Sequence, residues 1–325
     1  MAKLDLAWLF NCLLLVASGL FLNFVFQDPR VVQFSKIALS RIRLAQTFRA
    51  VGTRTSFSTS SVQQIAQNNM SEIIFYDIKS NVPGYSVSPT TWRTSSASSN
   101  DVGNRYCLNL KGLKYKSQYV EFPEIAPLYK KLGVPAPDTN SDGSPHYTLP
   151  MIYDPSTNKY IPDSTDIAIY LDKQYPDLPR IFPPGTERLQ MQFSNAAMSS
   201  IPAAGNLLTW RVFARLNPIS QEYYRRVRET VWRVKLEQMI PDDQNTTGMA
   251  TLKKVMGKID ALYVRNGAKG PFVLGETPSW ADITISAMLV ILKVSWGEDS
   301  DYWKQVISWN DGRWERFFAE MKKYE

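Results

Sequence analysis

The stretch from His146 to Tyr175 constrains the fold more strongly than any other part of the chain. A short apolar run at 151–153 has strand character, and a turn of Asp, Pro, Ser, Thr and Asn residues separates it from a second such run at 159–161. After this hairpin, apolar residues recur at helical spacing from Ile167 onward, and acidic residues stand where the helix would begin. The sequence therefore predicts two antiparallel strands that lead directly into a capped helix.

The two ends of this hairpin carry groups that could bind a small zwitterionic peptide. A proline that opens a strand leaves neighbouring backbone groups unpaired at an edge, and a cis bond between Leu149 and Pro150 would also make a tight bend. Leu149 could then pair its backbone with an extended peptide. At the next helix start, Asp163 and Ser164 offer a carboxylate, a hydroxyl and backbone N–H groups, which can hold opposite charges. The plain alternative is a hairpin that feeds a capped helix and binds nothing.

Three motifs, by their order and spacing along the chain, resemble the glutathione transferases. The hairpin stretch, from Leu149-Pro150 to Asp163-Ser164 and the helix after it, resembles the glutathione-binding half of that family. SPTTWRT at 88–94, with RYCLNLKG at 105–112, resembles the active-site helix of its serine-type, β-etherase-like classes, which include a fungal-specific class. FVLGETPSWADI at 272–283 resembles the capping-box segment of its C-terminal domain. The resemblance covers residues 70–325.

That resemblance implies a glutathione transferase fold, in which an α/β thioredoxin-like domain is followed by an all-α helical bundle. We expect a hydrophobic and basic leader over residues 1–69, the thioredoxin-like glutathione-binding domain over 70–178 and the all-helical domain over 186–325. The Pro/Gly-rich segment at 179–185 is the expected linker between the two domains.

The local patterns give the same order of elements. Residues 73–76 and 114–121 predict strands, and residues 123–132 predict a short helix that ends at Gly133. Ser279 and Asp282 form a capping box, which indicates a helix start and not catalysis. Downstream of the linker, helical spacing covers residues 186–216, 219–240, 252–264, 279–296 and 302–323, with a break at 241–248.

Residues 95–104, SSASSNDVGN, depart from the family pattern because they fall inside its expected first helix. Ser, Asn and Asp favour caps and turns over helix interiors. Without this segment, Trp92 and Tyr106 would stand four positions apart and would restore one apolar helix face. We interpret the segment either as a genuine loop or as a splicing error in the sequence.

The leader carries two targeting signals and most of the positive charge. Residues 7–26 are long and apolar enough to span a bilayer, and the basic residues after them would leave the downstream chain in the cytosol. Residues 54–61 resemble the processing region of a mitochondrial transit peptide, and Met70 resembles an alternative start. Residues 1–71 hold a net +5 of the chain's +7, which leaves an ordinary +2 for the rest. We therefore expect a cytoplasmic or cytosol-facing, membrane-anchored protein, with the mitochondrion as the alternative, and no nucleic-acid partner.

The cysteines and the histidine argue against several kinds of site. Cys12 and Cys107 are the two cysteines, and His146 is the single histidine. We therefore expect no disulfide framework, no metal and no Ser–His triad, and a reducing compartment. We interpret Cys107 as buried packing. His146 either touches glutathione or closes the loop before the strand, and we favour the second.

The family resemblance also assigns roles to individual residues. Ser88, with Pro89 after it at a predicted helix start, would donate a hydrogen bond to the glutathione sulfur and favour the thiolate; a helix cap is the alternative. Leu149 would offer backbone groups to the cysteinyl part and Pro150 would fix the bend, whereas Asp163 and Ser164 would hold the γ-glutamyl end. An apolar pocket for a second substrate could be lined by aromatic residues, although such residues are more often core: Tyr85, Trp92, Trp210 and Phe213.

Our first hypothesis is a homodimeric glutathione transferase that contacts a membrane only through its leader. With glutathione as co-substrate, it would conjugate a hydrophobic electrophile or cleave an aryl ether. The alternative is a ligandin-like or partner-binding protein on the same fold, which the segment at 95–104 favours. A third hypothesis is thiol–disulfide exchange through Cys107, which requires that thiol to be exposed and reactive.

Overall fold

The computed structural model describes residues 71–82, 101–140, 142–200, 206–239, 246–265 and 270–325. Apart from residues 184–189, these residues belong to one compact unit of the chain. The predicted leader lies outside the described residues, and so does the membrane span expected at 7–26. None of the helices that the structure describes is long and apolar enough to cross a membrane.

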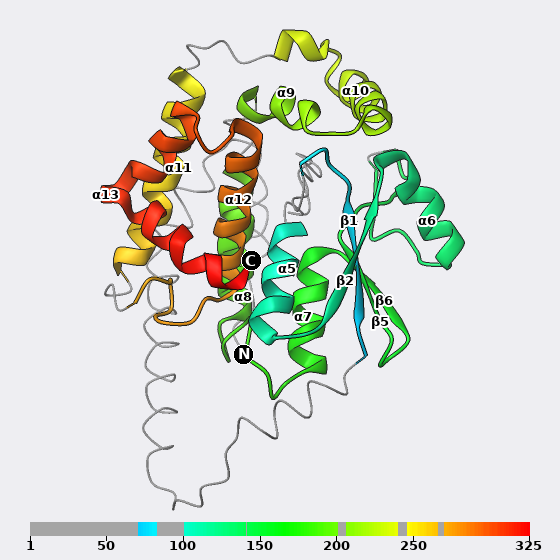
Figure 1. The fold of residues 1–325 in the computed structure, drawn as a ribbon, viewed down its shortest axis with the longest axis horizontal. Helices are drawn as coiled ribbons and strands as arrows, with labels where there is room; N and C mark the ends of the chain where they lie inside the picture. The colour runs from blue at the N-terminus through cyan, green and yellow to red at the C-terminus, as the bar shows by residue number, and fades with distance from the viewer. Residues whose placement is uncertain (1–70, 83–100, 141, 201–205, 240–245, 266–269) are drawn as a thin grey trace, which may run out of the picture. The chain divides into compact units, whose positions relative to one another are not determined.

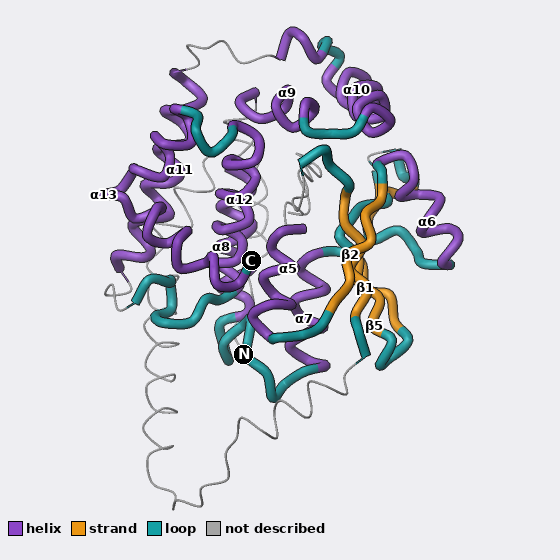
Figure 2. The backbone as a smooth tube through the Cα atoms, viewed as in Figure 1, coloured by secondary structure: helices purple, strands orange, loops and turns teal. Residues whose placement is uncertain are grey.

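A four-stranded mixed sheet forms the first half of this unit (Figures 1 and 2). Its strands are β1 (Ile73–Ile78), β2 (Tyr115–Val120), β5 (Met151–Asp154) and β6 (Lys159–Pro162). They lie in the order β2-β1-β5-β6, with β1 parallel to β2 and antiparallel to β5, and with β5 antiparallel to β6. The predicted hairpin is confirmed. A separate pair, β3 (Asp138–Thr139) and β4 (Pro145–His146), closes the loop before it and contains the histidine.

Helices cover both faces of the sheet because its strands alternate apolar residues between the two sides. On one face lie α5 (Asp101–Lys111) and α7 (Ser164–Gln174), and on the other lie the short turn η2 (Phe122–Glu124) and α6 (Ile125–Leu132). Phe75 packs in the cluster that includes α5 and α7, whereas Tyr76 packs with Tyr129 of α6. Helix α6 ends at Gly133, which has the left-handed φ of 68° predicted for this position.

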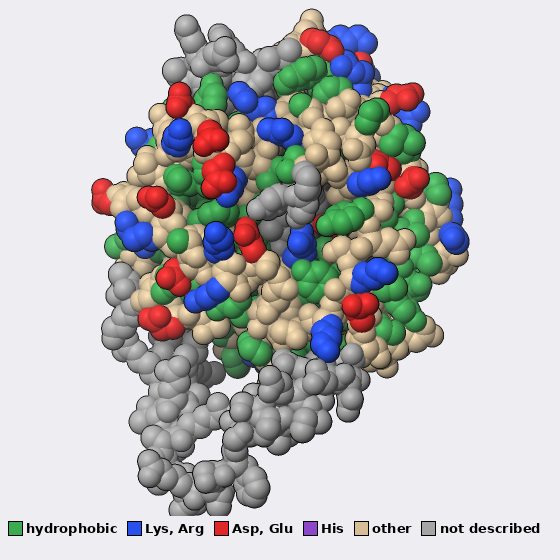
Figure 3. All heavy atoms as spheres, viewed as in Figure 1, with side chains coloured by type: hydrophobic (Ala, Val, Ile, Leu, Met, Phe, Trp, Pro, Cys, Tyr) green, Lys and Arg blue, Asp and Glu red, His purple; other side chains and the backbone are tan. Residues whose placement is uncertain are grey.

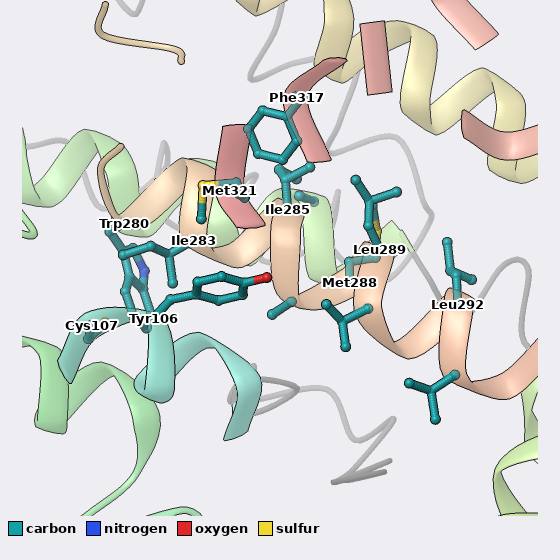
Figure 4. Close-up of a cluster of buried hydrophobic side chains, with 14 of the residues drawn as sticks. Tyr106, Cys107, Trp280, Ile283, Ile285, Met288, Leu289, Leu292, Phe317 and Met321 are labelled. Atoms are coloured by element: carbon teal, nitrogen blue, oxygen red, sulfur yellow. The ribbon is translucent and has the colours of Figure 1, made fainter. Parts of the chain in front are cut away.

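The second half of the unit is helical. Its elements are α8 (Glu187–Ser200), α9 (Asn206–Ala214), α10 (Pro218–Trp232), η4 (Leu236–Met239), α11 (Thr246–Arg265), α12 (Trp280–Trp296), α13 (Asp301–Met321) and η5 (Lys322–Tyr324). Helix α12 is apolar around most of its circumference and is buried along nearly its whole length, as expected for a central core helix. Figure 4 shows Tyr106 and Cys107 of α5 packed against Trp280 and Ile283 of α12. The two halves therefore share one hydrophobic core.

The predicted capping box at the start of α12 is confirmed. Asp282 is fully buried, and its Oδ2 accepts hydrogen bonds from Ser279 N at 2.9 Å and Ser279 Oγ at 2.8 Å. Its Oδ1 accepts from Tyr263 Oη at 2.9 Å and Val273 N at 2.8 Å. Burial raises the pKa of the Asp282 carboxyl, and these hydrogen bonds oppose that rise. The box thus joins the start of α12 to α11 and to the loop between them.

Several boundaries differ from the prediction, and the helix expected over 219–240 ends at Trp232, where Arg233 has a left-handed φ of 55°. Residues 101–104, expected in caps or turns, form the first turn of α5; residues 95–100 lie outside the described part of the chain. Helix α11 begins at Thr246, inside the expected break. The last predicted helix is interrupted at residues 309–312, where Asn310, Asp311 and Gly312 all have positive φ.

Charges of both signs are mixed on the face of the molecule shown in Figure 3. Lys and Arg side chains of the described residues lie among Asp and Glu side chains there. This mixture agrees with the small net charge that the sequence leaves outside residues 1–71.

Candidate functional site

The structure brings the two ends of the hairpin together. The Leu149–Pro150 peptide bond is cis. Met151, the next residue, stands opposite Pro162 in the β5–β6 register, so Pro150 lies beside Asp163. The N–H of Asp163 donates to the carbonyl of Pro150 at 3.2 Å. The start of one strand and the start of α7 therefore form a single local structure, as the sequence predicts.

Asp163 is held in a restricted backbone conformation at the start of α7. Its φ of 69° is unusual for a residue with a side chain, and such conformations persist where surrounding contacts hold them, often at binding sites. Its Oδ1 accepts from Thr165 N at 2.8 Å and from Asp166 N at 3.4 Å. Burial raises the pKa of the Asp163 carboxyl, and the hydrogen bond from Thr165 opposes this. Asp163 therefore caps α7 and orients the residue that follows it.

Ser164 and Leu149 both have groups available for a ligand. Ser164 is fully buried at the first position of α7, and its Oγ has no hydrogen-bond partner among the described residues. The positive end of the helix dipole favours an anion at this place. The side chain of Leu149 is also buried, and its backbone precedes the ladder with β1, which begins at Met151.

Asp154 joins the turn of the hairpin to the last turn of α7. Its Oδ1 accepts from Ser156 N at 2.9 Å and from Ser156 Oγ at 2.6 Å. Its Oδ2 accepts from the hydroxyls of Tyr170 at 2.8 Å and Tyr175 at 2.6 Å. Burial alone would raise the pKa of this carboxyl, but the hydrogen bonds outweigh burial and lower it. The hairpin is thereby fixed to α7 at the end opposite the candidate site.

A buried ion pair aligns α7 with α5. Lys111 Nζ lies 2.8 Å from Asp172 Oδ1, and the two side chains are 0% and 8% exposed. Lys111 Nζ also donates to the carbonyl of Tyr175 at 3.2 Å. Asp172 accepts two further hydrogen bonds from the segment after α7, from Ile181 N at 3.0 Å and from Phe182 N at 2.8 Å. One carboxylate thus connects α5, α7 and the connection to the second half.

The segment that follows β1 is attached to the end of α9 (Figure 1). The backbone N–H of Asn81 donates to Arg215 O at 2.9 Å. Its side-chain Nδ2 donates to Ala214 O at 3.0 Å and lies 3.5 Å from Leu216 O. Asn81 therefore satisfies carbonyls that the end of α9 leaves unpaired. No local pattern predicts this contact, because the partners are more than 130 positions apart.

The end of β2 is attached to the start of α10 in a similar way. Glu121 accepts from Asn217 Nδ2 at 2.8 Å and from Ser220 Oγ at 2.5 Å. Ser220 Oγ in turn accepts from Phe122 N at 2.9 Å, and the Phe122 ring stacks on Tyr223 at 6.1 Å. The ends of both parallel strands are thus fixed to the α9–α10 pair.

Of the four aromatic residues predicted for a second-substrate pocket, the structure describes two. Trp210 and Phe213 lie on α9, are half-buried, and have ring centroids 5.1 Å apart. The Arg225 guanidinium lies 5.1 Å from the Phe213 ring centroid. Tyr85 and Trp92 lie outside the described residues, and so does Ser88, the predicted thiol-activating residue.

Cys107 does not meet the requirement of the thiol-exchange hypothesis. Its side chain is fully buried on α5. Burial raises the pKa of the Cys107 thiol, and the neighbouring Asp172 carboxylate adds to this rise. A protonated, enclosed thiol is a poor nucleophile, so Cys107 acts as core packing. This is the role that the sequence predicts for it.

Comparison with known proteins agrees with this architecture. The family model described as glutathione S-transferase, N-terminal domain, matches residues 103–180, and that described as glutathione S-transferase, C-terminal domain, matches residues 189–324. The chain is 32% identical over 259 residues to the glutathione S-transferase-like protein ustS of Aspergillus flavus, which covers 74% of this chain and 87% of that protein.

Two solved structures are similar over most of the chain. The glutathione transferase GSTFuA3 from Phanerochaete chrysosporium has 36% identity and a TM-score of 0.70, over 79% of this chain and 98% of that one. The glutathione S-transferase CsGST63524 of Ceriporiopsis subvermispora, in complex with glutathione, has 37% identity and a TM-score of 0.71, over 78% of this chain and 98% of that one.

Proposed function

Because this chain belongs to the glutathione S-transferase family, we propose that it activates the thiol of glutathione for reaction with hydrophobic aromatic small molecules. Its fold is the glutathione transferase fold, a thioredoxin-like domain followed by a helical domain. The reaction is conjugation to an electrophile or cleavage of an aryl ether. In both, the thiolate forms a C–S bond while the leaving group departs with the bonding electron pair.

One observation carries the proposal. The hydrogen bond from Asp163 N to Pro150 O joins the strand start to the helix start, where the buried hydroxyl of Ser164 has no partner among the residues that the structure describes. A tripeptide with a cysteine in the middle suits this arrangement. The backbone of Leu149 would pair with the cysteinyl residue, while Asp163 and Ser164 would hold the zwitterionic γ-glutamyl end. A solved relative has glutathione bound, which supports this ligand.

Ser88 is our candidate for activation of the thiol. It would donate its hydroxyl to the sulfur at a helix start, where the dipole also favours the anion. One charge-assisted hydrogen bond is worth roughly 1.5–3 kcal/mol, which lowers the thiol pKa by about one to two pH units. Our proposal that this protein is a serine-type glutathione transferase depends on this role of Ser88.

The proposal is tested by titrating the thiolate absorbance of bound glutathione in the wild type and in Ser88→Ala. We expect the bound thiol pKa to rise by about one to two pH units in Ser88→Ala and kcat with 1-chloro-2,4-dinitrobenzene to fall by about tenfold or more. Ser86 and Thr90 are the near competitors for this role, so Ser86→Ala and Thr90→Ala are measured beside Ser88→Ala, and we expect both to leave the thiol pKa and turnover unchanged. Unchanged thiol pKa and turnover in Ser88→Ala would refute the role of Ser88.

The same experiment separates catalysis from binding. Glutathione affinity without turnover of either 1-chloro-2,4-dinitrobenzene or an aryl ether would select the ligandin-like alternative. Trp210 and Phe213 support a second, aromatic ligand, because both rings are half-buried on a helix whose end is attached to the segment after β1. We also propose that the protein works as a homodimer, which sedimentation at micromolar concentration would test.

A further inference from the structure

The side chain of Asn104 on α5 is unusual among the described residues. It is 0% exposed, and neither its Oδ1 nor its Nδ2 has a hydrogen-bond partner in the part of the chain that the structure describes. Buried polar groups in native proteins are nearly always paired, because an unpaired one is costly. An amide that lacks partners for both its donor and its acceptor therefore needs an explanation.

The lysine–aspartate pair shows where Asn104 lies. Helices α5 and α7 run in the same direction, because each follows a strand, β1 or β6, and those two strands are parallel to each other through β5. Lys111 at the end of α5 pairs with Asp172 near the end of α7, which fixes the faces that meet. Asn104 stands seven residues before Lys111, or two helical turns, and so lies on the same face.

Ser164 occupies the matching place on α7. It stands eight residues before Asp172 on the stripe of positions 164, 168 and 172, all of which are buried. Cys107 of α5 lies between Asn104 and Lys111 in the sequence, and the Asp172 carboxylate of α7 adds to the rise in its thiol pKa that burial causes. Asn104 and Ser164 are therefore level with each other at the N-terminal ends of two parallel helices, and each has buried polar atoms without a partner.

We propose that Asn104 is a glutathione-binding residue that, together with Ser164, holds the α-amino acid head of the γ-glutamyl group. The proposal rests on the proposed function. A carboxylate accepts from the Asn104 Nδ2 amide and the Ser164 hydroxyl at the positive end of α7, and an ammonium donates to Asn104 Oδ1. A simple anion or a simple cation would satisfy only one of the two unpaired atoms of Asn104. A zwitterionic amino acid head satisfies both.

The test compares Asn104→Leu with the wild type by calorimetry, using glutathione and butyryl-Cys-Gly, which lacks both the α-amino and the α-carboxylate group of the γ-glutamyl residue. We expect Asn104→Leu to weaken glutathione roughly a hundredfold, because two hydrogen bonds to charged groups are lost, and to change the affinity for the analogue less than twofold. In the absence of ligand, Asn104→Leu should melt roughly 2–4 °C higher, because leucine removes an unpaired buried amide without changing the side-chain size much.

Two further variants keep the test decisive. Asn104→Asp retains the size of the side chain, and its negative charge should weaken glutathione by more than tenfold while sparing the analogue. Ser286→Ala is the matched control, because Ser286 is also fully buried with an unpartnered hydroxyl among the described residues, but lies on α12. It should leave both affinities unchanged.

Two results would overturn the assignment. One is glutathione affinity within twofold of the wild type in both Asn104 variants. The other is a lower melting temperature with equal loss of both ligands in Asn104→Leu, which would show a purely structural asparagine. If the wild type itself fails to bind glutathione, the proposed function is wrong, and this inference falls with it.

Discussion

The buried pair of Lys111 and Asp172 allows a sharp test of how the glutathione-binding half is held together. Asp172→Leu would leave the Lys111 ammonium, whose side chain is 0% exposed, with the Tyr175 carbonyl at 3.2 Å as its one remaining partner among the described residues. It would also remove the acceptor of two backbone N–H groups, those of Ile181 and Phe182. Removing one partner of a buried pair costs about 3–5 kcal/mol, so we expect a loss of that size in the free energy of unfolding.

Lys111→Met should destabilise less, because the Asp172 carboxylate would keep the N–H groups of Ile181 and Phe182 as donors. Because one hydrogen bond to a charged group is lost, we expect the free energy of unfolding to fall by roughly 1.5–3 kcal/mol. The double variant leaves no uncompensated charge. We therefore expect its destabilisation to be smaller than the sum of the two single values by roughly 1–3 kcal/mol.

Urea unfolding followed by tryptophan fluorescence would measure all three values, with Lys323→Met as the control. Lys323 forms an exposed pair with Glu320, with side chains 51% and 50% exposed, and its loss should change stability little. If the two single effects simply add, the ion pair does not couple α5 to α7, and the alignment on which the position of Asn104 is argued loses its support.

Two other predictions concern catalysis and pH. Asn81→Ala removes the side-chain bond to Ala214 O at the end of α9, so we expect a higher KM for 1-chloro-2,4-dinitrobenzene with unchanged glutathione affinity; Asn109→Ala, which removes a similar bond to Tyr324 O, is the control. An equal change in the KM for 1-chloro-2,4-dinitrobenzene and in the Kd for glutathione would contradict a role confined to α9. Asp154 has a lowered pKa, so its contribution to stability is present above the unfolded pKa of about 3.9 and is lost as pH falls through the lower folded value. Melting curves between about pH 2 and 6 should therefore lose part of their acid dependence in Asp154→Asn, and an unchanged profile would show that this carboxylate is not linked to folding.

Local signals were sufficient for most of the fold. The hairpin, α7 and the capping box were predictable because a turn, a cap and an alternation of apolar residues each depend on neighbours a few positions apart. The interruption of α13 also has a local signal, which the prediction overlooked: Asn310, Asp311 and Gly312 favour turns and positive φ. Residues 309–312 adopt left-handed or extended conformations in a sequence, Trp-Asn-Asp-Gly, whose flanks continue the apolar spacing of a helix. Trp309 and Trp314 on either side of the break are both buried, so the apolar spacing continues across it.

The candidate site divides in the same manner. The junction of Leu149-Pro150 with Asp163-Ser164 was predictable, because strand pairing in a short hairpin brings its two ends together whatever the rest of the chain does. Asn81 and Asn104 were not. Asn81 acts on α9 from a distant part of the sequence, and Asn104 belongs to a segment whose composition favours turns, so nothing local marks it as a buried helical residue.

The position of the candidate site depends on the helical half of the chain as much as on the thioredoxin-like half. Helix α5 lies between α7 and α12, and the start of α12 is tied to the connection after α7 by the hydrogen bond from Trp280 N to Ile181 O at 2.9 Å. Ile181 is also one of the residues that Asp172 holds. A shift of α12 would therefore move α5 and the end of α7 together, and would carry Asn104 and Ser164 with them. It follows that a variant that displaces α12, such as Trp280→Ala, should change glutathione affinity through Asn104 and Ser164, although α12 itself supplies no proposed ligand. Ser286→Ala removes one oxygen atom and leaves the helix in place, so it remains a control.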